Sequence, residues 1–225
     1  MISHKHKCIF IHIPKCAGTS FEELLGHFDE HEGRAGQDHR SVRMIQKPFK
    51  LLDALSNKEN VKDTIRRFRE YTRSPANPNN ALTVTSLQYQ SYFKFTVVRE
   101  PLERAYSWYK NVMRDPIHQK NYNIPAEISF EDFMFRYAGT GYLRPQSYWL
   151  LNYSGEVDLD LIIKFEQLQD GFKQLCSQLN IDQATLPHKI AGSNGAKELK
   201  ISSKVRDFVY DFYADDYKRF GYEQT

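Results

Sequence analysis

Residues 8–21 read CIFIHIPKCAGTSF and combine a strand pattern, a short loop and the start of a helix. The run 8–13 is rich in β-branched and aromatic residues, which is typical of a strand covered on both faces. The loop after it holds Lys15 and several small residues, and the helical pattern of 20–26 follows. We therefore expect a buried strand that passes directly into a loop and a helix.

Two further runs repeat this order of strand and helix. They are residues 93–98 (FKFTVV) and 159–165 (LDLIIKF). Helical patterns follow both, over 101–114 and from Leu168 to Leu179, and the C-terminal stretch carries another from Val205 to Phe220. Alternating strands and helices predict an α/β fold of three layers, with a mostly parallel sheet flanked by helices and ligands bound at the carboxyl ends of its strands.

The composition is that of a folded protein with one large core. The 225 residues are 40% hydrophobic and 14% aromatic, and we expect a single domain over 1–225. The net charge of +3 is too small to make nucleic acid the expected partner. No apolar run approaches the roughly 20 residues of a membrane span. Three cysteines without framework spacing indicate a cytoplasmic protein, and the polar segment 4–7 is expected to be a mobile tail.

The loop after the first predicted strand has the composition of an anion site. N–H groups and the positive dipole end at a helix start attract negative charge. Gly18 would let the backbone approach a ligand closely, and Lys15 adds a full positive charge. The structural alternative is that Thr19 or Ser20 only caps the helix and that Lys15 is solvated. The order G-x-x-x-x-G-K-[ST] is absent, which disfavours a nucleoside triphosphatase.

A second candidate anion site follows the second predicted strand. Arg99 lies where that strand ends, and on the next helix Glu100, Arg104 and Ser107 lie close to one line, opposite an apolar stripe. Arg99 and Ser107 can therefore converge on one phosphate, which suits a guanidinium fork and a hydroxyl. The structural alternative is an ion pair between Arg99 and an acid such as Glu103.

Together the two segments resemble the nucleotide-binding motifs of sulfotransferases that use 3'-phosphoadenosine 5'-phosphosulfate (PAPS). The similarity is greatest to the carbohydrate branch, the heparan and chondroitin type of sulfotransferase family 2, and to its soluble bacterial-type members. It covers nearly the whole chain and is weakest over residues 49–90. The resemblance implies a P-loop-like nucleotide-binding architecture, PAPS as sulfuryl donor and no required metal. By position it implies that the 5'-phosphosulfate is held by Lys15, Cys16, Ala17, Gly18, Thr19, Ser20 and Phe21, and the 3'-phosphate by Arg99 and Ser107.

The same resemblance implies an in-line displacement at sulfur by an acceptor hydroxyl. Lys15 would neutralise the charge that develops on the bridging oxygen of the leaving group. A general base must take the acceptor's proton, and histidine is the usual choice. His39 is the first candidate, because it lies in a polar loop between the two motifs, where the family often has its base. His12 is the second, although a structural role fits it as well; His188, Glu22 or another carboxylate stay open.

The acceptor is not fixed by these motifs. The resemblance implies a carbohydrate, a glycolipid or a small molecule, and residues 49–90 would help to shape its site. Gln146 and Tyr148 are candidates for an acceptor groove, and Tyr148 could equally belong to the core. The competing functions are a P-loop-like nucleotide kinase or triphosphatase, which would need magnesium, and a non-catalytic module that binds an anion or nucleotide. The oligomeric state stays open.

Overall fold

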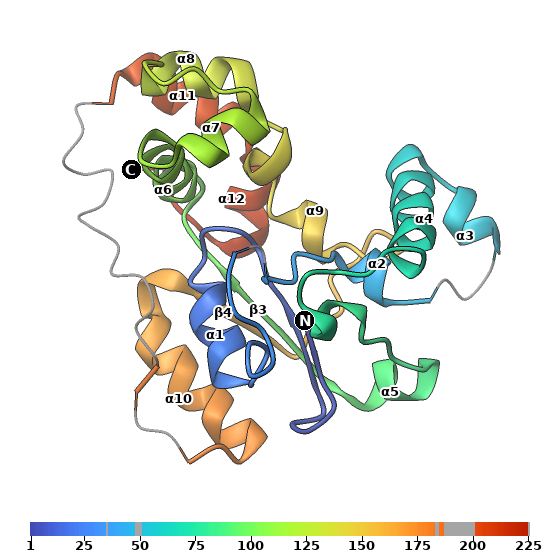
Figure 1. Cartoon of the computed structure of the whole chain (residues 1–225). Helices are drawn as coiled ribbons and strands as arrows, with labels where there is room; N and C mark the ends of the chain where they lie inside the picture. The colour runs from blue at the N-terminus through green and yellow to red at the C-terminus, as the bar shows by residue number, and fades with distance from the viewer. Residues whose placement is uncertain (35, 48–50, 183–184, 187–200, 225) are drawn as a thin grey trace. The chain divides into compact units, whose positions relative to one another are not determined.

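The computed structural model describes residues 1–34, 36–47, 51–182, 185–186 and 201–224. The chain divides into two compact units, and each is described by itself (Figure 1). The first unit comprises Met1–Val98 with Ser147–Ile190, and the second comprises Arg99–Gln146 with Ala191–Thr225. A single domain over 1–225 stays a prediction.

The first unit is built on a four-stranded sheet in the order β1-β2-β3-β4. β2 is parallel to β3 and β3 is parallel to β4, so that the carboxyl ends of these three strands lie at one edge. All three predicted strands are confirmed, with β2 and β4 somewhat shorter than expected. The strands are β1 (Ile2–Ser3), β2 (Cys8–Ile11), β3 (Phe93–Val98) and β4 (Leu161–Lys164).

The N-terminal residues are part of this sheet. β1 pairs antiparallel with β2 through Ile2 and Ile9, and residues 4–7 form the turn between them. The expectation of a mobile tail is therefore wrong. The polar turn is held because Met1 and Ile2, each 1% exposed, are buried in the core.

Helices cover both faces of the sheet, as the predicted α/β class requires. Figure 1 shows α1 and α10 on one side of the strands and α5 on the other. Aromatic rings fill the space under α1 and α10: Phe21 packs against Phe95 and Phe172, and Phe10 stacks on Phe95. The helices of this unit are α1 (Gly18–Leu24), α2 (Val42–Ile45), α3 (Leu51–Leu55), α4 (Lys58–Tyr71), η1 (Pro78–Ala81), α5 (Ser86–Ser91), α9 (Ser147–Leu150), η3 (Phe165–Gln167) and α10 (Leu168–Leu179).

The second unit is helical. Its core is an aromatic and aliphatic cluster that includes Tyr106, Trp108, Phe133 and Tyr213. The predicted helix over 101–114 is confirmed, and the C-terminal pattern is divided into two helices. The elements are α6 (Pro101–Met113), α7 (Pro116–Tyr122), α8 (Phe130–Tyr137), η2 (Gly141–Leu143), α11 (Ser203–Phe212) and α12 (Ala214–Phe220).

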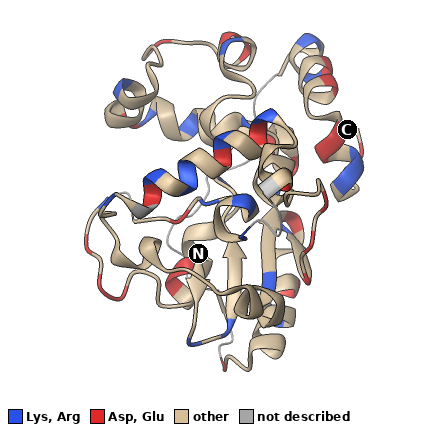
Figure 2. Ribbon diagram, turned by 90° about the vertical axis from the view of Figure 1, so that its right-hand side faces the viewer, with Lys and Arg blue, Asp and Glu red and all other residues tan. Residues whose placement is uncertain are grey.

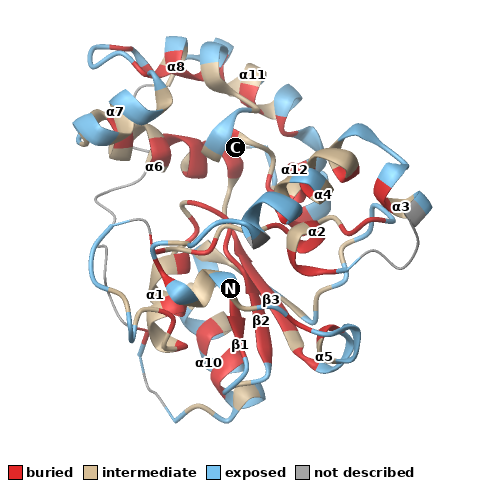
Figure 3. Cartoon of the chain, turned by 45° about the vertical axis from the view of Figure 1, so that its right-hand side comes forward, coloured by how far each residue is buried: buried red, intermediate tan, exposed pale blue. Residues whose placement is uncertain are grey.

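Most residues of the strands are buried, and exposed and charged residues lie along the outer faces of the helices (Figure 2, Figure 3). Figure 3 shows the strands buried and the outer faces of the helices exposed. Figure 2 shows Lys and Arg interspersed with Asp and Glu along the helices. Across the described residues, no helix is both long enough and apolar enough to cross a bilayer.

Arg104 does not lie on a polar face of α6, as its spacing from Glu100 and Ser107 suggested. It is 1% exposed, and its guanidinium donates hydrogen bonds to the main-chain oxygens of Tyr142 (2.8 Å) and Arg144 (2.6 Å). A long cation can be buried in this way because charged hydrogen bonds offset its lost hydration. Arg104 thus fixes η2 and the residue that follows it against α6.

We predict that Arg104→Met lowers the free energy of unfolding by about 3 kcal/mol, because two buried carbonyls lose a charged donor. The measurement is chemical denaturation of the purified chain. Arg219→Met is the matched control: it breaks only an exposed pair with Asp215 and should cost about 1 kcal/mol or less. Equal losses in the two variants would contradict this role of Arg104.

Candidate functional site

The loop between β2 and α1 has an unusual backbone. Lys15 and Ala17 both have a positive φ, 71° and 59°, in the left-handed region that residues other than glycine seldom adopt. Such residues cost energy, persist only where surrounding contacts impose them, and cluster at binding sites. Left-handed residues alternating along a loop also turn main-chain N–H groups to one side, which suits an anion. The predicted anion loop therefore has the backbone of a binding loop.

The start of α1 excludes one structural alternative. The N-cap is Ala17, without a side-chain hydrogen bond, so neither Thr19 nor Ser20 caps the helix. Both hydroxyl residues are half-buried in the first turn. Cys16 and Phe21 have buried side chains and could reach a ligand only through the backbone.

A glycine is needed at position 18 because the side chain of His12 fills the space where a Cβ would lie. A Cβ at this position would lie 1.9 Å from Cδ2 and 2.2 Å from Nε2 of the His12 ring. The ring therefore occupies the room that the missing side chain of Gly18 leaves. The structure thus gives Gly18 a packing role beside His12, and the expectation that its backbone approaches a ligand closely stays a prediction.

His12 is held by a buried carboxylate. Its Nδ1 lies 3.0 Å from Oε1 of Glu22, which also accepts the N–H of Asp38 at 2.9 Å. Glu22 is 0% exposed. Burial raises the pKa of Glu22, but the charge and hydrogen bond of His12 outweigh it, and the pKa lies below its usual value. Glu22 is thus a buried anion that orients the His12 ring through its contact with Nδ1.

His39 contacts both the main chain and the ring of His12. Its Nδ1 donates to the main-chain oxygen of His12 at 3.2 Å, and the two rings lie 4.2 Å apart between centroids. Burial and the neighbouring charge of His12 lower the pKa of His39 to about 3. A ring that donates through Nδ1 and is neutral carries its lone pair on Nε2. The two histidine candidates, together with Lys15 and Gly18, therefore belong to one region of the first unit.

Arg99 begins the second unit, where its backbone is clamped by Gln146. The amide of Gln146 accepts from the Arg99 N–H (2.9 Å) and donates to its carbonyl (2.8 Å). The guanidinium lies 3.5 Å from the Glu103 carboxylate, so the ion pair offered as the structural alternative is present. Ser107 is half-buried on α6.

Two acceptor candidates have structural roles. Gln146 is 0% exposed, and its amide serves the Arg99 backbone, so it does not line a groove. Its N–H donates to Asp216 at 2.5 Å. The Tyr148 hydroxyl donates to Asp63 at 3.0 Å. His188 lies outside the described residues.

Sequence reasoning missed the pairing of Glu22 with His12. Glu22 stood only among the minor candidates for the base, because nothing local marks a helical glutamate as buried. The available signal was its place one turn after Gly18 in a helix that also carries Phe21 toward the core.

The comparisons with known proteins identify the family. A family model described as "Sulfotransferase family" matches residues 1–223. The chain belongs to the sulfotransferase family. Carbohydrate sulfotransferase 10 of Xenopus laevis is 24% identical to this sulfotransferase over 261 residues, covering 99% of the chain and 67% of the relative. The Homo sapiens protein of the same name is 23% identical over 264 residues, covering 99% and 66%. No solved structure matches significantly.

The family assignment confirms the predicted resemblance and the prediction of a transferase that uses a sulfuryl donor. The chain spans about two thirds of the length of these relatives. The roles of the individual site residues, and the meeting of Lys15 with Arg99 at one donor, stay predictions.

We predict that Gly18→Ala destabilises this sulfotransferase by about 1 to 3 kcal/mol, since the added methyl overlaps the His12 ring and must displace it. Thermal unfolding measures the effect. Ser20→Ala, in the same helical turn, is the control and should change stability by no more than about 0.5 kcal/mol. A Gly18→Ala variant as stable as the Ser20→Ala variant would contradict the close packing on His12.

Proposed function

We propose that this sulfotransferase moves a sulfuryl group from PAPS to a hydroxyl of a carbohydrate-containing acceptor, with His39 as general base. The observation that carries the proposal is the strained loop after β2, in which Lys15 and Ala17 adopt left-handed backbone conformations in a member of the sulfotransferase family. Such a loop holds its N–H groups in place before the ligand arrives, which favours binding and transition-state stabilisation.

The 5'-phosphosulfate would bind at this loop. Lys15 supplies the positive charge, and the N–H groups of the loop supply donors for the sulfate and phosphate oxygens. During transfer, the bond from sulfur to the bridging oxygen breaks, and charge develops on the departing adenosine 3',5'-bisphosphate. A lysine near that oxygen lowers the barrier by neutralising this charge.

The 3'-phosphate would bind to Arg99 and Ser107. The chain itself supports this assignment: Arg99 follows Val98, the last residue of β3, and β3 runs parallel to β2. Its ion pair with Glu103 is long, at 3.5 Å, and a guanidinium has five N–H donors. A phosphate can therefore bind Arg99 while Glu103 limits its rotation.

The base would act through Nε2 of His39. In the proposed step, the acceptor oxygen forms a bond to sulfur while its proton passes to Nε2. The bond from Nδ1 to the His12 carbonyl orients the ring, and the lowered pKa keeps the ring neutral at physiological pH, with its lone pair on Nε2. His12 is better suited to support than to proton transfer, because its ring is held between Glu22 and Gly18.

The acceptor class comes from the relatives. The curated proteins most similar in the comparison are named carbohydrate sulfotransferases, and we extend a carbohydrate acceptor from them to this chain as part of the proposal. A glycolipid is included in that class. The competing kinase or triphosphatase would require a triphosphate with magnesium, and the binding experiment below separates it.

The donor assignment is tested by thermal shift with adenosine 3',5'-bisphosphate, ADP and ATP, each with and without magnesium. We expect a rise in melting temperature with the 3',5'-bisphosphate that does not depend on magnesium; a ligand at 100 times its Kd adds about 2.7 kcal/mol of stability. Arg99→Ala should weaken this binding by about 10- to 150-fold, the equivalent of one charged hydrogen-bonding group.

Arg219→Ala is the control, because Arg219 pairs only with Asp215 on its own helix in the part of the chain that is described. Equal affinity in Arg99→Ala and the wild type would remove Arg99 from the site. A shift with ATP and magnesium alone would favour the kinase or triphosphatase.

For the base, we predict that His39→Ala lowers kcat by about 10²- to 10⁴-fold and leaves the affinity for adenosine 3',5'-bisphosphate unchanged. Because the folded pKa of His39 is depressed to about 3, the ring stays neutral as the pH falls through 6.5. The acidic limb of kcat/KM should therefore lie well below pH 6.5. Initial rates over a pH series measure it.

His4→Ala, in the turn between β1 and β2, is the matched control and should keep wild-type turnover. Wild-type turnover in His39→Ala would assign the base elsewhere, and a similar loss in His12→Ala with intact folding would make His12 the first candidate.

A further inference from the structure

Arg99 is held at its backbone as well as at its guanidinium. It lies between Val98, the last residue of β3, and Pro101, the first residue of α6. Oε1 of Gln146 accepts the Arg99 N–H at 2.9 Å, and Nε2 of Gln146 donates to the Arg99 carbonyl at 2.8 Å. Two opposite bonds to one residue are the pattern by which a neighbouring strand holds a strand residue. The Gln146 amide thus fixes the backbone from which the Arg99 side chain starts.

Gln146 is itself anchored by a buried carboxylate of the C-terminal helix. Its main-chain N–H donates to Oδ2 of Asp216, on α12, at 2.5 Å. Both residues are 0% exposed. A bond to a charged acceptor is about twice as strong as a bond between neutral groups, and burial strengthens it further. A residue of α12 therefore determines where the Gln146 amide lies.

The next residue of α12 holds the start of α6. The Tyr217 hydroxyl donates to Oε1 of Glu100. Glu100 is the N-cap of α6, and its carboxylate accepts the N–H groups of Leu102 (3.1 Å) and Glu103 (2.6 Å). Ser107, the second proposed ligand of the 3'-phosphate, lies on this helix. Hydrogen bonds thus link α12 to the segment that carries both proposed phosphate ligands.

The Arg99 side chain is restrained at both of its ends. Gln146 fixes the backbone, and the Glu103 carboxylate lies 3.5 Å from the guanidinium. A long side chain loses rotamer freedom when it binds a phosphate, and earlier restraint reduces this cost. A guanidinium also binds phosphate through directed hydrogen bonds, so that a displacement of about 1 Å weakens the contact. The position of the Arg99 backbone should therefore affect affinity.

An amide has the chemistry that this position requires. It accepts through its oxygen and donates through its nitrogen, whereas a carboxylate only accepts and an aliphatic side chain does neither. Gln146→Glu keeps the size and the acceptor of the side chain but loses the donor to the Arg99 carbonyl. Gln146→Leu loses both bonds. The two variants therefore separate the effect of shape from that of hydrogen bonding.

We propose that Gln146 and Asp216 are positioning residues of the donor site. Asp216 holds Gln146, and Gln146 fixes the Arg99 backbone so that the guanidinium meets the 3'-phosphate of PAPS. In this role neither residue contacts the nucleotide. The inference rests on the proposed binding of the 3'-phosphate by Arg99 and adds the residues that make this binding effective.

The test is isothermal titration of the full chain with adenosine 3',5'-bisphosphate, arranged as a double-mutant cycle. Gln146→Leu and Gln146→Glu should each weaken binding by about tenfold, because the Arg99 backbone is no longer fixed. In the Arg99→Ala background, Gln146→Leu should change the affinity by less than about twofold, since Gln146 acts only through the missing side chain. General damage to the fold would instead weaken binding equally in both backgrounds.

Asp216 is tested by a disruptive and a conservative variant. Asp216→Ala should weaken binding of adenosine 3',5'-bisphosphate by about fivefold or more, because the Gln146 N–H loses its acceptor. Asp216→Asn keeps an oxygen that can accept this N–H, and its loss should be about twofold or less. Equal losses in the two variants would contradict the role of Asp216.

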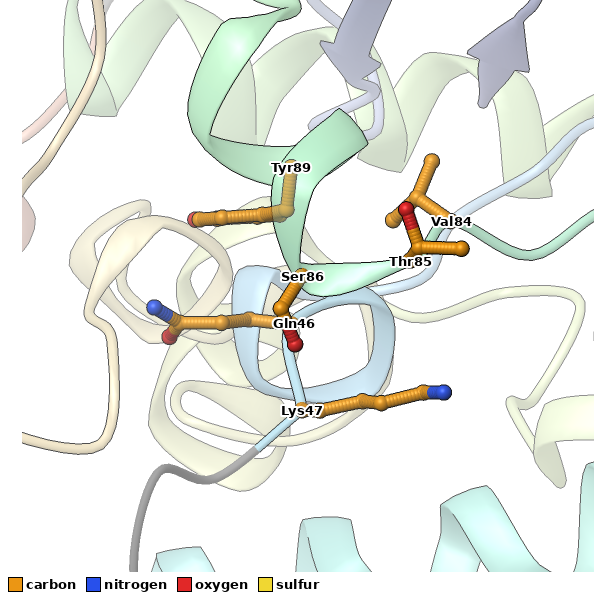
Figure 4. Close-up of a pocket in the computed structure, with 6 residues that line it drawn as sticks. All are labelled: Gln46, Lys47, Val84, Thr85, Ser86 and Tyr89. Atoms are coloured by element: carbon orange, nitrogen blue, oxygen red, sulfur yellow. The ribbon is translucent and has the colours of Figure 1, made fainter.

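Gln46→Leu is the matched control for Gln146→Leu. Gln46 is also a buried glutamine, 6% exposed, but it belongs to the first unit, where Figure 4 shows it at a small pocket with Ser86 and Tyr89. This variant should bind adenosine 3',5'-bisphosphate like the wild type. Thermal melting shows which variants fold, and Gln146→Glu completes the cycle where Gln146→Leu does not fold.

The outcomes separate this inference from the proposed function. Wild-type affinity in Gln146→Leu, together with the expected loss in Arg99→Ala, would overturn the positioning role alone. An equal loss from Gln146→Leu with and without the Arg99 side chain would overturn it as well. Wild-type affinity in Arg99→Ala would remove the proposed 3'-phosphate site, and this inference with it.

Discussion

The contact between the Glu22 carboxylate and the His12 ring connects the three parts of the candidate site. The carboxylate, on α1, contacts the histidine after β2 and the main chain at Asp38, one residue before His39. A carboxylate with no exposure is tolerated only where such partners compensate its lost hydration, and the loss of one partner leaves an uncompensated charge. The strand, the helix and the loop that carries His39 are therefore held in one arrangement.

This constraint also explains how an unfavourable backbone is maintained. Lys15 and Ala17 have no intrinsic preference for the left-handed region. The loop that holds them is anchored at both ends, by the parallel pairing of β2 with β3 and by the contact between His12 and Gly18. The local preferences of these residues conflict with their conformation, and conflicts of this kind are expected where a chain serves binding as well as folding.

The strands and most helices could be predicted because their signals are local. Apolar runs and helical stripes reflect burial, and burial here follows the sheet and helix faces closely. Non-local interactions could not be predicted. Periodicity places Arg104 on a polar face, but two carbonyls about 40 positions away stabilise it in the core. The turn at residues 4–7 is polar, yet β1 pairs with β2 because Ile2 has a place in the core.

At the candidate site, too, local signals could be predicted from the sequence and non-local contacts could not. Lys15, Gly18 and Arg99 could be proposed as site residues from the sequence because each follows a strand, and their roles stay predictions. The sequence could not show that Gly18 accommodates His12, or that the Gln146 amide is committed to the Arg99 backbone, since both contacts depend on side chains brought together by the fold.

The edge strands of the sheet affect whether it can pair with another chain. Within the described residues, its outer strands are β1 and β4, which have two and four residues. Outer strands present main-chain groups that can pair with another molecule, and the risk of aggregation grows with their length and flatness. Edge strands this short present few main-chain groups for such pairing, although Ile162 of β4 is 40% exposed. The sheet that positions the loop thus leaves little edge at which two chains could join.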